Sequence, residues 1–361
     1  MRKLFYIGVL LTIIFTNSAQ AFEVSEPIQS SVVITNRNLS TMSNSLKKDV
    51  YLMNIKLTPK QKQTLMETRA KNTLSQMNAA HQSLPMRVEL GMNGVPVLDQ
   101  GKHGTCVTFA VTGAIDAILG KGDYISQLCN LELGTYLDRR GYYKLSGWDG
   151  FTGPFALNQI LQFGIINKVK QKTKSCAGVT EYPLNSEYNH GKPMSLDEFK
   201  SKSEDMFVKI YWEPILDYFQ SINIDPAHPY DADQTFLQVK QALAAAQNTV
   251  NPMRIVFGSF LPVGHCGPGA CARYHENQDT WALTQAIMND PDSWFKAGHE
   301  MIITGYDDNA VAIDNEGQKH TGLFILRNSW GNDVGDQGNY YMTYDFFKKF
   351  VIEVQEIIAT E

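Results

Sequence analysis

The chain has 361 residues, of which 43% are hydrophobic and 19% are charged, with a formal net charge of −5. This balance is typical of a globular protein with one large or two modest cores, and it excludes a disordered, collagen-like or repeat protein. The acidic surplus also argues against nucleic acid as a partner.

Residues 1–21 have the pattern of a secretory signal. Two basic residues precede an apolar run from Leu4 to Phe15, and the segment ends on the small-x-small sequence AQA. The apolar run is shorter than the about 20 residues that a transmembrane helix needs. We therefore expect cleavage after Ala21 and a secreted mature protein, periplasmic or extracellular, with no membrane attachment and with disulfides permitted.

Residues 22–84 differ in charge from the rest of the chain. They carry eight Lys or Arg and four Asp or Glu, a net charge of +4, whereas residues 85–361 carry −11. Two β-like runs, SSVVIT and DVYLMNIKL, precede a helix that begins at Thr58-Pro59. That helix has an apolar stripe formed by Met66, Ala70, Leu74 and Met77. Opposite charges favour docking, so the segment is either a detachable pro-segment or a part of the main core.

Residues 83–101 are loop-like and lead into a helix at Cys106. Small apolar residues line this helix, which ends at Gly120 or Gly122. Further helices are expected at QLCNLELGTYLDRRGYY, PFALNQILQFG and TFLQVKQALAAAQ, and strands dominate from RIVFGSFL onward. Helices first and strands later predict an α+β protein with two lobes.

The two C-terminal runs HEMIITGYDD and GLFILRNSW both read as strands, with turn residues between them. In an antiparallel hairpin, two residues face each other when their residue numbers add up to about the same total along the whole hairpin. A register that places Tyr306 opposite Gly322 also brings His299 beside Asn328. An imidazole beside a carboxamide is held in one orientation, as a catalytic base requires.

Cys106 stands where a loop becomes a helix, and the N–H groups of a helix start lower the pKa of a thiol. A thiol nucleophile also needs an imidazole, a partner that orients it, and donors for an oxyanion. His299 and Asn328 supply the first two. The side-chain amide of Gln100 and the main-chain N–H of Cys106 are the candidate oxyanion donors. Alone, Cys106 would be interpreted as a structural cysteine; this combination indicates a nucleophile.

Three blocks, DQGKHGTC, GHEMIITGY and RNSWGNDVGDQGNYY, resemble in sequence and order the signature blocks of papain-like cysteine peptidases. The resemblance extends in outline over residues 84–361, and with the signal segment the chain looks most like a secreted bacterial member. It implies a helical left lobe with Cys106, a β-rich right lobe with His299 and Asn328, and a cleft between them for an extended peptide.

The resemblance also implies residue roles. Cys106 would attack the scissile carbonyl, His299 would protonate the leaving amine, and water would release the acyl group. Trp330 would shield the bond between His299 and its amide partner from solvent. Gly104 and Gly150 would support the site or contact the peptide backbone. The resemblance implies no cofactor and no metal.

The chain departs from the family at several positions. His103 stands where a disulfide cysteine is usual, Val107 replaces a Trp, and Gly298 replaces an Asn or Asp before the histidine. The family's long pro-helix motif is not recognisable in residues 59–81. The family's disulfide pattern, pocket specificity and inhibition geometry therefore do not carry over. We expect His103 to be a surface loop residue and not a second base.

The other four cysteines allow three pairings; they are Cys129, Cys176, Cys266 and Cys271. The short loop CGPGAC favours a local disulfide, which leaves Cys129 for Cys176. A zinc site is the alternative, with loosely spaced ligands His265, Cys266, Cys271 and His275. The expected location outside the cytoplasm favours disulfides.

The sequence therefore predicts an α+β, papain-like two-lobe protein with a signal (1–21), an inhibitory pro-segment (22–84) and a catalytic domain (85–361). The predicted function is a secreted cysteine endopeptidase, made as a zymogen, that cleaves protein or peptide substrates through a thioacyl-enzyme. We expect a monomer whose other partner is its own pro-segment. An acyltransferase shares the chemistry up to the acyl-enzyme. A silent binding module is the third hypothesis, suggested by Val107 and Gly298.

Overall fold

The computed structural model describes residues 23–35, 46–71, 84–185, 192–222, 230–247 and 252–360. The predicted signal, residues 1–21, lies outside the described residues. No helix in the described part of the chain is long and apolar enough to span a bilayer.

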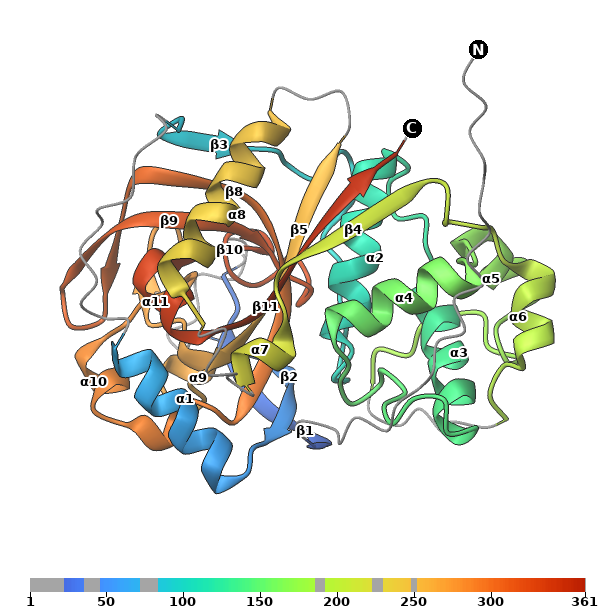
Figure 1. The fold of residues 1–361 in the computed structure, drawn as a ribbon, viewed down its shortest axis with the longest axis horizontal. Helices are drawn as coiled ribbons and strands as arrows, with labels where there is room; N and C mark the ends of the chain where they lie inside the picture. The colour runs from blue at the N-terminus through green and yellow to red at the C-terminus, as the bar shows by residue number, and fades with distance from the viewer. Residues whose placement is uncertain are drawn as a thin grey trace, which may run out of the picture.

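The first lobe is helical and lies on the right in Figure 1. Its helices are α2 (Cys106–Leu119), α3 (Gln127–Arg139), α4 (Gly153–Phe163), α5 (Lys168–Lys174) and α6 (Leu196–Lys202). Nearly every residue of α2 is buried, because the helix packs on α3 and α4 on one side and on β5, β8 and β11 on the other. The helix ends at Gly120, whose φ of 62° is the left-handed conformation that the sequence predicted for this glycine.

The second lobe is built on strands, and the described residues form an 11-stranded sheet. Eight strands follow the order β4-β11-β5-β8-β6-β7-β10-β9, and the other three, β1, β2 and β3, join it off this path, β2 and β3 through β8 and β1 through β2. The strands are β3 (Arg87–Glu89), β4 (Ile210–Leu216), β5 (Met253–Leu261), β6 (Ala272–Arg273), β7 (Thr280–Trp281), β8 (Ala297–Asp314), β9 (Lys319–Arg327), β10 (Asn339–Thr343) and β11 (Val351–Ala359). Because β8 also pairs with β9, the strands from β8 to β9 close on themselves.

One long helix, α8 (Ala232–Ala246), and several short ones accompany this sheet (Figure 1). The short ones are α7 (Tyr218–Ile222), α9 (Cys266–Gly269), α10 (Gln285–Met288), α11 (Tyr344–Phe350) and the 3₁₀ turn η2 (Pro291–Ser293). A helical lobe followed by a β-rich lobe confirms the predicted α+β, two-lobe architecture.

The predicted hairpin is formed by β8 and β9, but its register differs from the expected one. Tyr306 lies opposite Phe324 and not opposite Gly322. The pairing is irregular between Ile303 and Gly305 and again after Asp307, where the two strands contribute unequal numbers of residues. The residue numbers of facing pairs therefore do not add up to one total along the hairpin.

The N-terminal segment, the described residues between 23 and 71, forms a hairpin and a helix. Strands β1 (Glu23–Val33) and β2 (Lys47–Lys56) pair antiparallel, and β2 in turn pairs with β8. Helix α1 (Pro59–Lys71) begins after Thr58, as predicted; the Thr58 N–H donates to Gln61 Oε1 and the Gln61 N–H donates to Thr58 Oγ1.

Of the predicted apolar stripe of this helix, Met66 is partly buried and packs against the hydrophobic core. The side chain of Ala70, and residues Leu74 and Met77, lie outside what the structure describes. Leu65 and Arg69, one turn apart on α1, are buried as well. The pattern did not indicate Arg69, because a charged residue does not count toward an apolar stripe.

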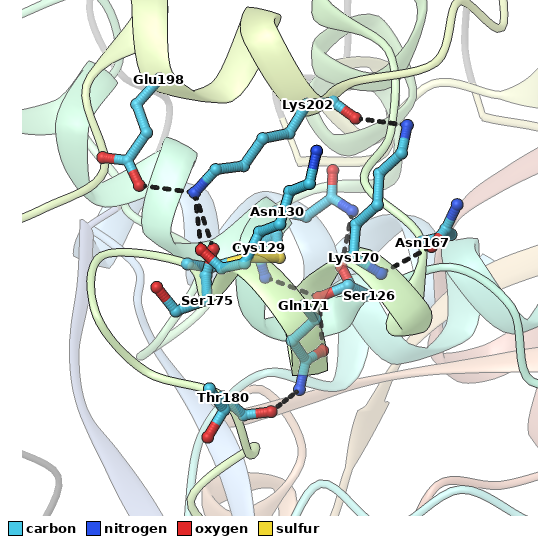
Figure 2. The surroundings of a disulfide bond; sticks show 12 residues. Ser126, Cys129, Asn130, Asn167, Lys170, Gln171, Ser175, Thr180, Glu198 and Lys202 are labelled. Carbon is cyan, nitrogen blue, oxygen red and sulfur yellow. Dashed lines mark hydrogen bonds and ion pairs between the residues drawn. A yellow bond between two sulfur atoms is a disulfide. The ribbon is translucent and has the colours of Figure 1, made fainter.

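Two disulfides join the four remaining cysteines as the sequence favoured, Cys129 with Cys176 and Cys266 with Cys271. The first ties α3 to the loop after α5 (Figure 2), beside a hydrogen bond of 2.6 Å from Ser126 Oγ to Gln171 Oε1. The zinc alternative is wrong, because both of its candidate sulfur ligands are bonded to each other.

We expect loss of the long-range disulfide to destabilise the protein more than loss of the local one. The first closes a 47-residue separation and the second a separation of five residues. Loop-closure entropy then gives about 4 kcal/mol for Cys129→Ala/Cys176→Ala and about 2 kcal/mol for Cys266→Ala/Cys271→Ala. Urea unfolding of both double variants measures the difference. A larger loss in the second variant would contradict the argument.

Candidate active site

Cys106 is the first residue of α2 and is fully buried. It is also the free cysteine of the described residues. The loop before it packs tightly on the loop before α4: a Cβ at Gly104 would lie 2.6 Å from the carbonyl oxygen of Asp149. A glycine at this position therefore lets the two loops of the helical lobe meet next to the thiol.

His299 and Asn328 meet as the sequence predicted. His299 Nε2 lies 2.8 Å from Asn328 Oδ1, and the same oxygen accepts the Ser329 N–H at 2.7 Å. The main-chain donor fixes the amide with its oxygen toward the ring, so Nε2 donates and Nδ1 keeps a lone pair. Nδ1 is buried and has no hydrogen-bond partner among the described residues. The ring is thus held as a base with its basic nitrogen unused.

Trp330 covers this pair, as predicted. Its ring stacks on the His299 ring with centroids 4.6 Å apart and an interplanar angle of 25°. Trp330 is 1% exposed and Asn328 is 3% exposed. Water is therefore excluded from the hydrogen bond between His299 and Asn328.

Gln100 joins the two lobes and presents an amide donor. Its main-chain N–H donates to the Ser329 carbonyl at 2.9 Å, and its Oε1 accepts the Ser329 hydroxyl at 2.8 Å. The amide nitrogen Nε2 donates to the His103 carbonyl at 2.8 Å and to the Tyr51 carbonyl at 3.1 Å. One N–H of the predicted oxyanion donor is therefore directed at a peptide carbonyl of β2.

Strand β2 passes through the site. Met53 pairs with Gly298, directly before His299, and its side chain reaches Gly150 on the helical lobe. A Cβ at Gly150 would lie 2.8 Å from Val24 Cγ1 and 3.1 Å from Met53 Cγ. A side chain at Gly150 would have to displace these two residues, and a Cβ at Gly298 would lie 2.5 Å from Ile55 Cδ1 and 3.2 Å from Met53 Cε, so both glycines favour the close approach of the hairpin. Nothing in the sequence pattern of the hairpin indicated that it would lie here.

This coverage leaves the thiol and the imidazole neutral. Burial raises the pKa of Cys106 to about 12, against the opposing effect of the main-chain N–H groups of Glu300, Val107 and Cys106. Burial lowers the pKa of His299 to about 4, although the hydrogen bond to Asn328 favours the protonated ring. The expected depression of the thiol pKa is therefore wrong for the covered site, because desolvation outweighs the helix start.

His103 corrects another expectation. It is 9% exposed and packs edge-on against Trp148 and Tyr182, with Nε2 2.9 Å from the Pro183 carbonyl oxygen. It is a buried part of the helical lobe and not a surface loop residue. The sequence analysis also missed Ser329, which anchors both Gln100 and Asn328; the NSW run contains it, but only packing shows its role.

The described residues contain no group of three or more His, Cys, Asp or Glu that could hold a metal ion. The arrangement has the parts of nucleophilic acyl transfer instead: a thiol at a helix start, an oriented base and an amide donor.

Residues 293–358, which include His299, Asn328 and Trp330, match the model of the Peptidase C1-like family. No curated protein matches the chain in sequence.

Several solved structures have a related shape. Xylellain, a cysteine protease from Xylella fastidiosa, has a TM-score of 0.45 and 17% identity, covering 79% of this chain and 92% of that chain. The ragweed pollen allergen Amb a 11, a cysteine protease in its proform, has a TM-score of 0.41 and 13% identity, and the match covers 81% of this chain and 73% of that chain. Digestive procathepsin L 3 of Tenebrio molitor larval midgut has a TM-score of 0.39 and 17% identity, and the match covers 82% of this chain and 78% of that chain.

In the intact chain we expect Cys106 to be inert toward iodoacetamide at neutral pH, because the sulfur is buried and its pKa is raised. Alkylation should reach its midpoint well above the ordinary value of about 8.5. Mass spectrometry at Cys106 over a pH series measures this. The denatured chain is the control and should show the ordinary midpoint; rapid alkylation of the folded chain at pH 7 would contradict the covered site.

Proposed function

We propose that this protein is a secreted bacterial cysteine endopeptidase, made as an inactive precursor. Cys106 attacks the scissile carbonyl and Nδ1 of His299 takes the thiol proton. The oxyanion is held by Gln100 Nε2 and by the main-chain N–H of Cys106. Asn328 holds the ring, and His299 returns the proton to the leaving amine. Water then releases the acyl group from the sulfur.

The observation that carries this proposal is the hydrogen bond from Gln100 Nε2 to the Tyr51 carbonyl. A peptide carbonyl lies on the amide donor beside the thiol, in an extended strand that also pairs next to His299. An extended peptide substrate needs the same contacts. The site thus accepts a polypeptide backbone, which favours a peptidase over an enzyme that acts on a small molecule.

We further propose that residues 22–84 are the inhibitory pro-segment. Ion pairs anchor its hairpin and helix to the acidic body: Lys48 Nζ lies 2.7 Å from Asp99 Oδ2 and 3.0 Å from Asp333 Oδ1. Lys62 Nζ lies 2.8 Å from Asp292 Oδ1. These contacts fit the predicted attraction between a basic segment and an acidic body.

The deepest anchor of this segment is Arg69. Its guanidinium is 2% exposed and donates to Ser221 Oγ at 2.6 Å, to the Val351 carbonyl at 2.7 Å and to the Lys348 carbonyl at 3.2 Å. It also lies 3.6 Å from the centroid of the Tyr230 ring. A buried charge with this many partners holds α1 in one position.

Removal of residues 1–84 should yield Cys106-dependent hydrolysis of a broad peptide library. Gln100→Ala should lower kcat by about 10²–10³-fold, because it deletes one oxyanion donor. Cys106→Ala is the matched inactive control, and a competing amine in the assay separates hydrolysis from acyl transfer. Absence of Cys106-dependent cleavage, with a Cys106→Ala variant that keeps its full biological effect, would point to a binding module.

Added in trans, a peptide of residues 22–84 should inhibit the processed enzyme. Arg69→Ala should weaken inhibition about tenfold to hundredfold, because it removes several charged hydrogen bonds. Lys48→Ala should have a smaller effect that fades at high salt. Lys60→Ala, on an exposed position of α1, is the matched control. Equal inhibition by the Arg69 and Lys60 variants would contradict the anchor.

A further inference from the structure

Two glutamates and a glycine form one row across three neighbouring strands. Glu353 on β11 pairs with Gly258 on β5, which pairs with Glu300 on β8. A Cβ at Gly258 would lie 2.8 Å from Glu300 Oε2 and 3.0 Å from Glu353 Cγ. Residues opposite one another in a sheet share a face, so the two acidic side chains meet above the glycine.

Both carboxyl groups are buried, but only one of them has donors. Glu353 Oε1 accepts the Gly153 N–H at 3.0 Å and Oε2 accepts Gln355 Nε2 at 3.2 Å. Neither oxygen of Glu300, which is 0% exposed, has a hydrogen-bond partner among the described residues. A buried carboxylate without a donor is too costly to persist. A proton on Glu300 resolves this, because the acid then donates to Glu353.

The row lies where the two lobes meet. Helix α2 packs on β8, β5 and β11, and α4 packs on β11 through its first residue, Gly153. The main-chain N–H of Glu300 lowers the pKa of Cys106, whereas a negative charge on the Glu300 carboxyl raises it. When the Glu300 carboxyl is neutral, its main-chain N–H still favours the thiolate of Cys106, and no negative charge on the side chain disfavours it.

We propose that Glu300 and Glu353 share one proton, and that this shared proton keeps a negative charge away from the thiol and holds the helical lobe on the sheet until it is lost at alkaline pH. Glu300 is thus a positioning residue. Its effect on the thiol rests on the proposed function, whereas the shared proton and its effect on stability do not.

The groups that face the pair are few. Cys106 comes from α2, Tyr218 is the first residue of α7, and Asp217 precedes it. Burial chiefly raises the pKa of Glu353, with a smaller contribution from the charge on Asp217; burial also raises the pKa of Tyr218, with a smaller contribution from Glu353. Helix α4 has no titratable side chain.

Two arginines lie on strands of the same sheet, and the guanidinium groups of both donate hydrogen bonds to residues other than the two glutamates. Arg254 of β5 donates to the carbonyls of Gly91 and Leu90. Arg327 of β9 lines the same small cavity as Glu300 but donates to Asn339 and Val95. Neither carboxyl forms an ion pair in the part of the chain that the structure describes. Burial and the neighbouring acid both raise the pKa of Glu300.

The sign of the pH effect follows. Between the ordinary pKa of a glutamate and the raised pKa of the pair, the folded chain binds more protons than the unfolded chain. The free energy of unfolding therefore falls as the pH rises through this range. Glu300→Gln keeps a donor for Glu353 but has no proton to lose, so it should remove this dependence.

The test uses the intact chain and needs no activity. Infrared difference spectra of the unmodified protein should show loss of a protonated carboxylic acid between neutral and alkaline pH. Glu300→Gln should remove that signal and raise the alkaline unfolding midpoint by about one pH unit. Glu353→Gln is the second variant, and Asp197→Asn, at an exposed position of α6, is the control without effect. The proposal of a shared proton would be overturned if the alkaline unfolding midpoint were unchanged in both Glu300→Gln and Glu353→Gln. It would also be overturned if the unmodified protein showed no infrared signal of a carboxylic acid.

The processed enzyme tests the positioning role. Its alkaline limit of kcat/KM should move to higher pH in Glu300→Gln and stay in place in Asp197→Asn, with the acid limit unchanged in both. A shifted unfolding midpoint with an unmoved alkaline limit would overturn the link to Cys106 and leave the shared proton standing. Failure of the peptidase itself would leave the infrared and unfolding results intact, so the two proposals fail separately.

Discussion

The candidate site depends on two hydrogen bonds between Gln100 and Ser329. They join the loop that carries the thiol to the loop that carries Asn328, and so to His299. Each lobe alone has only half of the parts: a thiol and an amide donor on one side, an oriented imidazole on the other. The distance between nucleophile and base is therefore a property of the junction and not of either lobe, which explains why the junction is buried and tightly hydrogen-bonded.

The buried site also shows that a complete set of catalytic residue types does not by itself make a reactive thiol. The helix start and three N–H groups favour a thiolate at Cys106, but desolvation of the fully buried sulfur outweighs them. Burial likewise lowers the pKa of His299 and keeps the ring neutral. Under the proposed function, removal of the segment changes the solvation of both groups and leaves their positions alone, so activation is an electrostatic event within a preformed geometry.

Sequence patterns were sufficient where the determinants are local. The helix at Cys106 and its glycine end follow from local spacing and turn chemistry, and so does the pairing of the two strands that carry His299 and lead to Asn328. The exact hairpin register did not, because two irregularities shift the strands. The position of β1 and β2, and the burial of Arg69, depend on contacts with residues more than two hundred positions away. Periodicity within a short segment has no information about such partners.

The pairing of β1 with β2 along nearly its whole length has a mechanical consequence. A lone strand in the cleft could peel away one residue at a time, and partial exposure of the thiol would follow. A strand stiffened by its own partner instead leaves as one piece, since bending it breaks the ladder between the two. Under the proposed function, departure of the hairpin is therefore cooperative, and the second strand makes the transition between the covered and the open site abrupt.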